Sequence, residues 1–269
     1  MVCGLQRMGV LCAAVLMAGG LLLGLQGQTI EKVQPMARDA HPGFEVATIK
    51  HSDPDDHSSG FHNDGRNIFI ENETMNMLIS FAYNVHVKQV VDAPAWFGSE
   101  RFDIKGFPDV AGVPGVGQYR EMVRKLLTER FQLQFKREQR EMPRFTLTVA
   151  KGGPKIEATK STAEDGLPDQ TGNINGGNVS WRFTNNSMMD FTGFLQMAVV
   201  DRPVVDETGL KGKYDFKLAW TANPEASTDP SAAPGFLTAL QEQAGLKVEP
   251  SKGVVEVLAV THVEQPSAD

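Results

Sequence analysis

Two short stretches of the chain, 113 residues apart, carry the same pattern and decide the fold. Residues 70–75 read IENETM, and residues 183–188 read FTNNSM. Each runs apolar, polar, Asn, polar, hydroxyl, Met, which is typical of a strand that ends just before a capped helix. Thr74 and Ser187 stand at the expected N-cap positions. The match indicates that one folding unit occurs twice.

Further matches follow in the same order and at a nearly constant offset. They join residues 102–105 to 214–217, residues 127–129 to 240–242, and residues 133–135 to 246–248. Single matches of this kind are weak evidence, but an ordered series is hard to obtain by chance. We therefore expect an internal duplication.

The shared unit predicts an α+β protein built from two β-α-β-β-α-β-β modules with largely antiparallel sheets. In the first copy the expected elements are strands at 67–70, 87–91 and 101–105 and helices at 75–82 and 119–130; in the second they are strands at 181–183, 203–205 and 213–220 and helices at 188–199 and 236–244. Each second helix should lead into a β-hairpin. The hairpins are expected at 131–149 and at 246–263, the latter around a turn at 250–253.

The first 27 residues have the layout of a secretory signal, with Arg7 as their only charge and an apolar run over residues 8–25. Gly27-Gln28 is a plausible cleavage point. The run is also just long enough to span a bilayer, so cleavage and a retained N-terminal anchor both fit. We expect an extracytoplasmic protein, periplasmic or secreted, that meets a membrane only through this segment if it stays uncleaved.

Composition divides the rest of the chain into modules and linkers. The signal peptide covers residues 1–27, and a linker covers residues 28–43. The first module covers residues 44–156, a linker rich in Gly, Asp, Asn, Thr and Ser covers 157–179, and the second module covers 180–266.

Cysteine content and charge restrict the chemistry. The two cysteines, Cys3 and Cys12, both lie in the signal, so the exported chain has no disulfide, thiol nucleophile or thiolate metal site. Loss of Arg7 with the signal leaves 25 basic against 33 acidic residues, a formal charge of −8. An acidic protein is a poor nonspecific binder of nucleic acid. We expect no nucleic-acid partner and no cofactor.

The most suggestive cluster of side chains lies in residues 51–64, which hold three histidines and four aspartates. Imidazole and carboxylate groups are ligands of Zn²⁺ and other divalent ions. The candidate ligands are His51, His57, His62 and Asp64, which would support an extracytoplasmic metal-dependent hydrolase. We favour a solvated loop between two strands and keep the metal site as the alternative, because the spacing fits no familiar helical or hairpin ligand pair.

Other motifs favour structural roles. Residues 112–117 are glycine-rich and precede a helix, but they lack the Gly-Lys-Ser/Thr ending of a phosphate-binding loop. Residues 120–144 hold eight basic and four acidic residues, which is typical of a solvated face, with an anionic partner as the alternative. The repeated carboxylates are Asp103 with Asp215 and Glu129 with Glu242, and the tryptophans are Trp96, Trp181 and Trp220. We assign the carboxylates to the needs of the fold rather than to acid–base catalysis, and the tryptophans to packing.

Several longer stretches together resemble one known family. They are residues 44–50 (FEVATIK), 72–79 (NETMNMLI), 93–104 (APAWFGSERFDI), 126–133 (LLTERFQL), 149–155 (VAKGGPK), 202–216 (RPVVDETGLKGKYDF) and 239–250 (ALQEQAGLKVEP). The chain resembles the soil-associated, acidobacterial duplicated orphan protein family, a domain of unknown function, over residues 44–266.

The resemblance implies export but no activity and no catalytic residue. Similar domains are attached to membrane metallopeptidases of the antibiotic-sensor type. Residues 203–216 are also similar, more weakly, to small N-terminal modules of secretins and TonB-dependent receptors, which bind proteins. We therefore expect a non-catalytic binding or protein-interaction module, with an envelope protein or a cell-wall component as partner. The sequence does not give its oligomeric state.

Overall fold

The computed structural model of the 269-residue chain describes residues 34–56, 58–160, 168–222 and 233–266. The signal predicted over residues 1–27 lies outside the described residues. The elements up to residue 149 are β1 (Phe44–His51), β2 (Gly60–Asp64), β3 (Asn67–Thr74), α1 (Met75–Tyr83), η1 (Val87–Gln89), β4 (Val90–Val91), η2 (Ala95–Gly98), β5 (Arg101–Pro108), α2 (Val116–Arg130) and β6 (Gln134–Val149).

The later elements follow nearly the same order. They are β7 (Glu157–Ala158), β8 (Asp169–Asn175), β9 (Asn178–Asn186), α3 (Met188–Ala198), β10 (Val204–Asp206), β11 (Tyr214–Thr221), α4 (Phe236–Ala239), the π-helical turn η4 (Leu240–Ala244) and β12 (Leu246–His262). Two strands, β7 and β8, lie in the stretch that was predicted to be a linker, residues 157–179. β8 pairs with β9 in an antiparallel hairpin. The turn between them contains Gly176 and Gly177, which both have positive φ.

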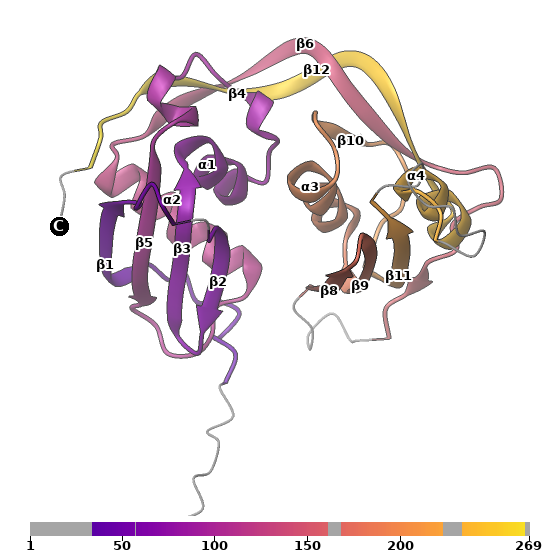
Figure 1. Ribbon diagram of the computed structural model, residues 1–269, viewed down its shortest axis with the longest axis horizontal. Helices are drawn as coiled ribbons and strands as arrows, with labels where there is room; N and C mark the ends of the chain where they lie inside the picture. Colours follow the sequence, from indigo (N-terminus) through magenta and orange to yellow (C-terminus); the bar gives the residue numbers. More distant parts are fainter. Residues whose placement is uncertain (1–33, 57, 161–167, 223–232, 267–269) are drawn as a thin grey trace, which may run out of the picture. The chain divides into compact units, whose positions relative to one another are not determined.

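Three four-stranded sheets result, and most of their strand pairs are antiparallel (Figure 1). The first has the order β1-β5-β3-β2, the second β10-β6-β12-β4 and the third β7-β11-β9-β8. The only parallel pairs between described strands are β10 with β6 and β4 with β12. The protein is a mixed α and β fold with antiparallel-rich sheets, as predicted.

The N-caps predicted at Thr74 and Ser187 are confirmed, whereas the helix predicted from residue 119 begins at Val116. The hydroxyl of Thr74 accepts from the backbone N–H of Met77, and the hydroxyl of Ser187 accepts from that of Asp190. Both satisfy N–H groups that a helix start leaves without an internal partner. The last helical segment ends at Gly245, whose φ of 64° places it in the left-handed region that a helix C-cap requires.

The first hydrophobic core lies between the first sheet and helices α1 and α2. Its largest fully buried side chains include Phe97, Phe102 and Phe131. Leu258 of β12 is part of this core, and Phe135 of β6 packs against it.

A second core lies between the third sheet, α3 and the α4–η4 segment. It contains Phe183, Phe191 and Phe216, whose rings pack against one another at 4.7–5.2 Å between centroids. Leu147 of β6 and Leu246 of β12 are fully buried in it. Each of the two long strands therefore contributes one end to each core.

The two predicted hairpins are wrong. Residues 134–149 form one continuous strand, β6, and residues 246–262 form another, β12. The two strands pair with each other along their whole length, from Leu246 opposite Val149 to His262 opposite Gln134 (Figure 1). The predicted β-α-β-β-α-β-β order is therefore wrong at its end, where one strand replaces a hairpin. It is also wrong at its start, where β1 and β2 precede β3.

Local backbone conformation explains why neither turn forms. Gly253, expected in the turn, has no positive φ, and its ladder partner is Met142. Pro250 lies opposite Phe145 in a part of β12 that, among the described strands, pairs with β6 alone, an edge position at which sheets accept proline. The chain thus stays extended through both expected turns.

Candidate functional site

A polar cavity lies at one end of the first sheet, where β1 ends, β5 begins and β3 is interrupted by a bulge. We call it the β1-end pocket; its volume is about 640 Å³. Its lining residues are His51, Ser52, Asp53, Pro54, Asp56, Ser59, Asn72, Ser99 and Arg101. Most of these side chains are polar, so the pocket suits a polar ligand.

Asn72 shapes the pocket through a left-handed backbone conformation, with φ of 53°. The ladder between β3 and β5 shifts its register between Ile70 and Glu73, so Asn72 is the extra residue of a β-bulge. Its side chain donates to the backbone carbonyl of Asp56 at 2.8 Å. The bulge therefore holds the loop that forms the opposite wall.

Asp103 of β5 anchors the pocket from beneath. It accepts from the backbone N–H of Asn72 at 2.9 Å and from the hydroxyl of Ser52 at 2.7 Å, and Lys50 lies 3.4 Å from its other oxygen. Burial raises the pKa of this carboxyl, but the hydrogen bonds from Ser52 and Asn72 and the charge of Lys50 outweigh burial and lower it. Asp103 is thus an ionised structural acceptor.

Arg101 gives the pocket its cation. Its Nη1 donates to the backbone carbonyl of Asn72 at 2.6 Å, and its own carbonyl accepts from the backbone N–H of Ser52. Within the described part of the chain its guanidinium makes no ion pair with a carboxylate. One bond fixes the group, and its other N–H donors remain available.

Glu73, the next residue after the bulge, is only 6% exposed. Burial raises the pKa of its carboxyl to about 7, while the charge of Arg101 opposes this shift. The residue 113 positions later is Asn186, which is fully buried and whose amide bonds to Gln170, Asp169 and Thr184. The first sheet therefore places a carboxyl where the third sheet places a well-bonded amide.

The predicted metal ligands do not lie together in the described residues. His51 ends β1, whereas His62 and Asp64 belong to β2, and β5 and β3 separate these two edge strands. Three strand spacings amount to about 14 Å. His57 lies outside the described residues, and the described ranges contain no group of three or more His, Cys, Asp or Glu side chains that could hold a metal ion.

Both remaining histidines of that set contact aromatic rings. His51 lies 5.0 Å from the ring of Phe102, and His62 stacks on Phe69 at the same centroid distance. His62 also lies 3.9 Å from Glu71. Of the three predicted ligands that lie in the described residues, His51 alone lines the β1-end pocket.

The carboxylates that recur in the sequence, Asp103 with Asp215 and Glu129 with Glu242, lie at separate places in the structure. Asp215 accepts from the backbone N–H of Asn185 at 2.7 Å, as Asp103 does from Asn72. Glu129 is exposed on α2, and Glu242 is exposed on η4. The geometry brings neither pair together for acid–base chemistry.

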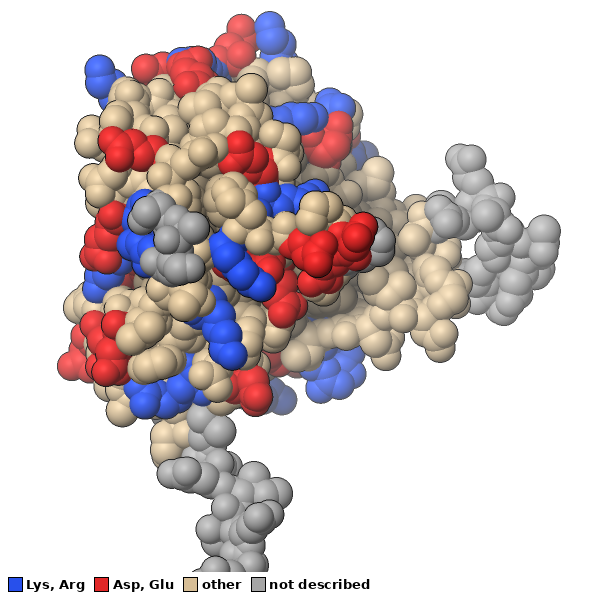
Figure 2. Space-filling view, turned by 60° about the vertical axis from the view of Figure 1, so that its left-hand side comes forward, with Lys and Arg blue, Asp and Glu red and all other residues tan. Residues whose placement is uncertain are grey.

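The basic run over residues 120–144 is largely paired in place. Arg140 forms ion pairs with Asp92 and Glu138, and Arg144 forms one with Glu207 at 3.0 Å. Figure 2 shows acidic and basic side chains interspersed over the face that it presents. This arrangement is a solvated, mixed-charge surface rather than a field that would attract an anionic polymer.

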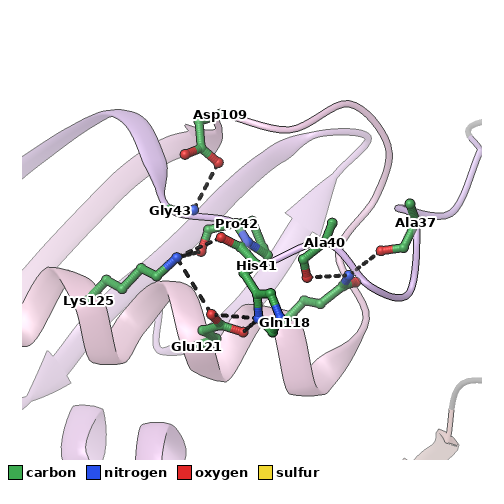
Figure 3. Close-up of polar contacts among 9 residues, drawn as sticks. All are labelled: Ala37, Ala40, His41, Pro42, Gly43, Asp109, Gln118, Glu121 and Lys125. Carbon is green, nitrogen blue, oxygen red and sulfur yellow. Dashed lines mark hydrogen bonds and ion pairs between the residues drawn. The ribbon is translucent and has the colours of Figure 1, made fainter.

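A second, more open cavity of about 500 Å³ lies on α2, beside residues 37–43. Gln118 donates to the carbonyl of Ala37 at 2.6 Å, and Lys125 donates to that of His41 at 2.6 Å (Figure 3). His41 bonds Glu121 at 3.2 Å. Because its charged side chains hold this segment onto the helix, the cavity is a weaker candidate than the β1-end pocket.

Tryptophan and glycine motifs pack as the sequence suggests. Trp96 packs against Phe97 and Phe102, and Trp220 packs against Phe236. Gly112 has a φ of 101°, and a Cβ there would lie 2.6 Å from Cα of Met36, so its freedom serves a close backbone approach.

Sequence reasoning missed Arg101 and Ser99 as pocket residues, because a lone arginine at a strand start carries no motif. Asn72 offered a signal, since asparagine recurs at position 185 and tolerates positive φ better than most residues.

Comparison with known proteins gives a family but no function. No curated protein matches the chain, and no solved structure matches it. One family model matches residues 76–263, so the β1-end pocket draws Ser99 and Arg101 from the matched region and its other lining residues from the preceding part. The expected resemblance to a domain of unknown function is confirmed: the chain belongs to the family described as Protein of unknown function (DUF3738).

Proposed function

We propose that the protein is a non-catalytic extracytoplasmic binding module whose ligand occupies the β1-end pocket. One observation carries this proposal: a cavity of about 640 Å³ holds a guanidinium, that of Arg101, which is fixed by the bulge yet free of a carboxylate partner among the described residues. Cavities of this size commonly accommodate small molecules or the end of a larger one.

The bonding inside the pocket supports binding over catalysis. The hydroxyl of Ser52 donates to Asp103, and Asp103 also holds Asn72 and Lys50. The carboxylate of Asp103 thus stabilises the shape of the pocket. Ser52 donates directly to this ionised carboxylate, with no imidazole between them, so its hydroxyl is not activated as a nucleophile in the usual way.

The proposal includes export and an envelope ligand, either a protein or a cell-wall component. Its support is the signal-like sequence of residues 1–27 and the absence of cysteine from residues 28–269. A thiol-free chain is stable in an oxidising compartment without any disulfide chemistry.

The proposal also includes an internal duplication. In it, β6 and β12 each contribute one half to the first copy and the other half to the second. The bulges at Asn72 and Asn185 support it, since both residues have positive φ and both donate a backbone N–H to an aspartate. The short parallel strands support it as well, because β4 joins β12 near residue 258 and β10 joins β6 near residue 145. Position 145 lies 113 residues before 258, which is the offset of the sequence repeat.

A solute screen tests the proposed function. Protein spanning residues 28–269 would be titrated with short peptides and with cell-wall disaccharides while backbone amide resonances are recorded. We expect a binding solute to shift the amides of Asn72, Ser99 and Arg101. Ser99→Trp, which fills the pocket, should abolish these shifts, and Ser180→Trp, at an exposed position of β9, should not. The proposal fails if no solute moves a pocket amide, or if Ser99→Trp leaves binding unchanged.

A further inference from the structure

Resting on the proposed function, we infer that the β1-end pocket recognises a zwitterion, the carboxylate and ammonium groups of an amino acid or short peptide, through Arg101 and Asp53. The inference comes from two opposite charges that line one cavity, each with unused hydrogen-bonding capacity.

Arg101 fits the carboxylate. A guanidinium carries five N–H donors in a rigid plane, and its edge can hold a carboxylate through two parallel bonds. One Nη1 bond to Asn72, at 2.6 Å, sets the plane. A pre-positioned guanidinium loses less side-chain entropy when a ligand arrives than a free one does.

Asp53 fits the ammonium group. One of its oxygens, Oδ1, accepts from the backbone N–H of Asp55 at 3.0 Å, which is an Asx turn within the loop. Among the described residues no cation pairs with this carboxylate. The turn orients Asp53, and its carboxylate keeps the capacity to accept from –NH₃⁺.

The remaining lining suits the polar middle of such a ligand. Ser59 and Ser99 offer hydroxyl groups, and His51 offers an imidazole that makes no hydrogen bond within the described chain. These groups can donate to and accept from a peptide amide.

Other ligand classes fit less well. A divalent cation needs several converging ligands, and the described ranges contain no such group. Sugar rings usually stack on an aromatic side chain, but the nearest tryptophan in the sequence, Trp96, packs against Phe97 and Phe102 and does not line the pocket. A doubly charged phosphate would meet one guanidinium and the carboxylates of Asp53 and Asp56. A zwitterion alone matches both signs.

Three related probes separate the two charges. L-alanyl-L-alanine carries both, its C-terminal amide lacks the carboxylate, and its N-acetyl derivative lacks the ammonium group. Affinities for protein spanning residues 28–269 would be measured by amide shift titration. We expect each capped probe to bind at least about tenfold more weakly than the free dipeptide, as for loss of one charge-assisted hydrogen bond.

Matched variants assign each charge to a residue. Arg101→Gln should weaken the free dipeptide about tenfold or more and remove the preference over the C-terminal amide. Arg101→Lys should lose less, because it keeps the charge but not the planar fork. Asp53→Asn should remove the preference over the N-acetyl probe. The controls are Arg182→Gln, at an exposed position of β9, and Asp55→Asn, in the same loop as Asp53 but outside the pocket lining, and both should bind as the parent does.

The outcomes separate this inference from the proposed function. In one outcome, a disaccharide shifts the pocket amides, Ser99→Trp abolishes those shifts, and the dipeptide shifts none of them. The zwitterion inference is then wrong, but the proposed binding site stands. If all three dipeptide probes bind equally, the inference is also wrong. If no probe of any class moves a pocket amide, both fall.

Discussion

Asp103 accepts a hydrogen bond from the backbone N–H of Asn72 at 2.9 Å, so a carboxylate on β5 holds a left-handed bulge on the neighbouring strand β3. Asp215 on β11 holds Asn185 on β9 in the same way, at 2.7 Å. A bulge leaves an N–H outside the strand ladder, and a half-buried N–H needs a partner. These two aspartates supply it.

Replacing these aspartates should destabilise the protein to different degrees. Asp215→Ala removes the acceptor of one backbone N–H, which typically costs about 1–3 kcal/mol. Asp103→Ala should cost more, because Ser52 and Lys50 lose their partner as well. Urea unfolding of both variants at pH 7 measures the difference.

Asp64→Ala, at the exposed end of β2, is the matched control and should change stability by less than about 0.5 kcal/mol. Since the pKa of Asp103 is lowered in the folded state, its contribution is present at neutral pH and lost as the pH falls through the acid range. Equal stability of the Asp103 and Asp64 variants would contradict the role assigned to Asp103.

Two cysteines introduced at directly opposed positions of β6 and β12 should form a disulfide. Gln139 lies opposite Glu256 in the ladder, and directly opposed residues of an antiparallel pair have Cα atoms about 4.5–5.5 Å apart, within disulfide range. Cysteines at these two positions should cross-link on mild oxidation, since residues 28–269 contain no other thiol. Mass spectrometry of a tryptic digest identifies the link.

Cysteines at positions 139 and 251 form the control pair. Ser251 lies opposite Arg144, so this pair is five residues out of register, about 16 Å along the strand, and should stay reduced. Cross-linking of the control pair with no link between 139 and 256 would show that β6 and β12 do not run side by side.

Local sequence signals predicted the helices correctly and the long strands incorrectly. N-caps such as Thr74 and apolar spacing in helices act within a few residues, so the printed sequence is enough to find them. A hairpin and a continuous strand share the same alternation, and Phe135 and Leu147 are apolar in either case. Which half-strand completes which core is decided by pairing over more than 100 residues, and no local pattern encodes that pairing.

The site was harder to predict than the fold for a similar reason. The density of histidine and aspartate over residues 51–64 suggested a metal site as an alternative to a solvated loop, but β5 and β3 pair between β1 and β2 and keep His51 apart from His62. Strand order is a property of the whole sheet. Arg101 becomes notable only once the bulge at Asn72 places its guanidinium beside the loop.

Truncation of Met36, a buried residue of the segment before β1, should lower the protection of that segment against hydrogen exchange. Met36 is 4% exposed, and its backbone N–H donates to the carbonyl of Val113 at 2.8 Å. Met36→Ala leaves a cavity, and truncation of a buried methionine to alanine costs about 2–5 kcal/mol. Hydrogen exchange of residues 36–43 should accelerate at least tenfold, whereas Met189→Ala, which is 69% exposed, should leave it unchanged.

His86 should make the protein less stable in mild acid. It is 5% exposed, its Nδ1 accepts from the backbone N–H of Lys88 at 3.1 Å, and its ring also bonds the backbone of Val200. Burial, with the charge of Lys88, lowers its pKa, although the bond to Val200 and the charge of Asp201 oppose this shift. The unfolded chain therefore takes up a proton first, and stability falls as the pH drops below about 6.5.

Thermal unfolding between pH 7.5 and pH 5 tests this prediction. His86→Asn, which keeps an acceptor but cannot titrate, should show a smaller loss on acidification than the parent. His262→Asn, an exposed histidine on β12, is the control and should follow the parent curve. A His86 variant that loses as much stability as the parent would assign the acid effect to other groups.

Glu73 should act in the opposite direction, because the folded state favours its neutral form. Burial raises its pKa to about 7 from an ordinary value near 4.5, so the folded chain binds this proton more tightly than the unfolded chain. Stability is then unaffected below about pH 4.5, decreases as the pH rises toward 7, and stays reduced above it, by at most roughly 3 kcal/mol.

Glu73→Gln removes the ionisation and keeps the shape, so it should be more stable than the parent at pH 8 and similar to it at pH 4.5. Glu71→Gln, on the same strand but partly exposed, should show no such gain at pH 8, and urea unfolding at the two pH values distinguishes them. A Glu73→Gln variant with no gain at pH 8 would mean that the buried carboxyl remains ionised without penalty, which the proximity of Arg101 alone would then have to explain.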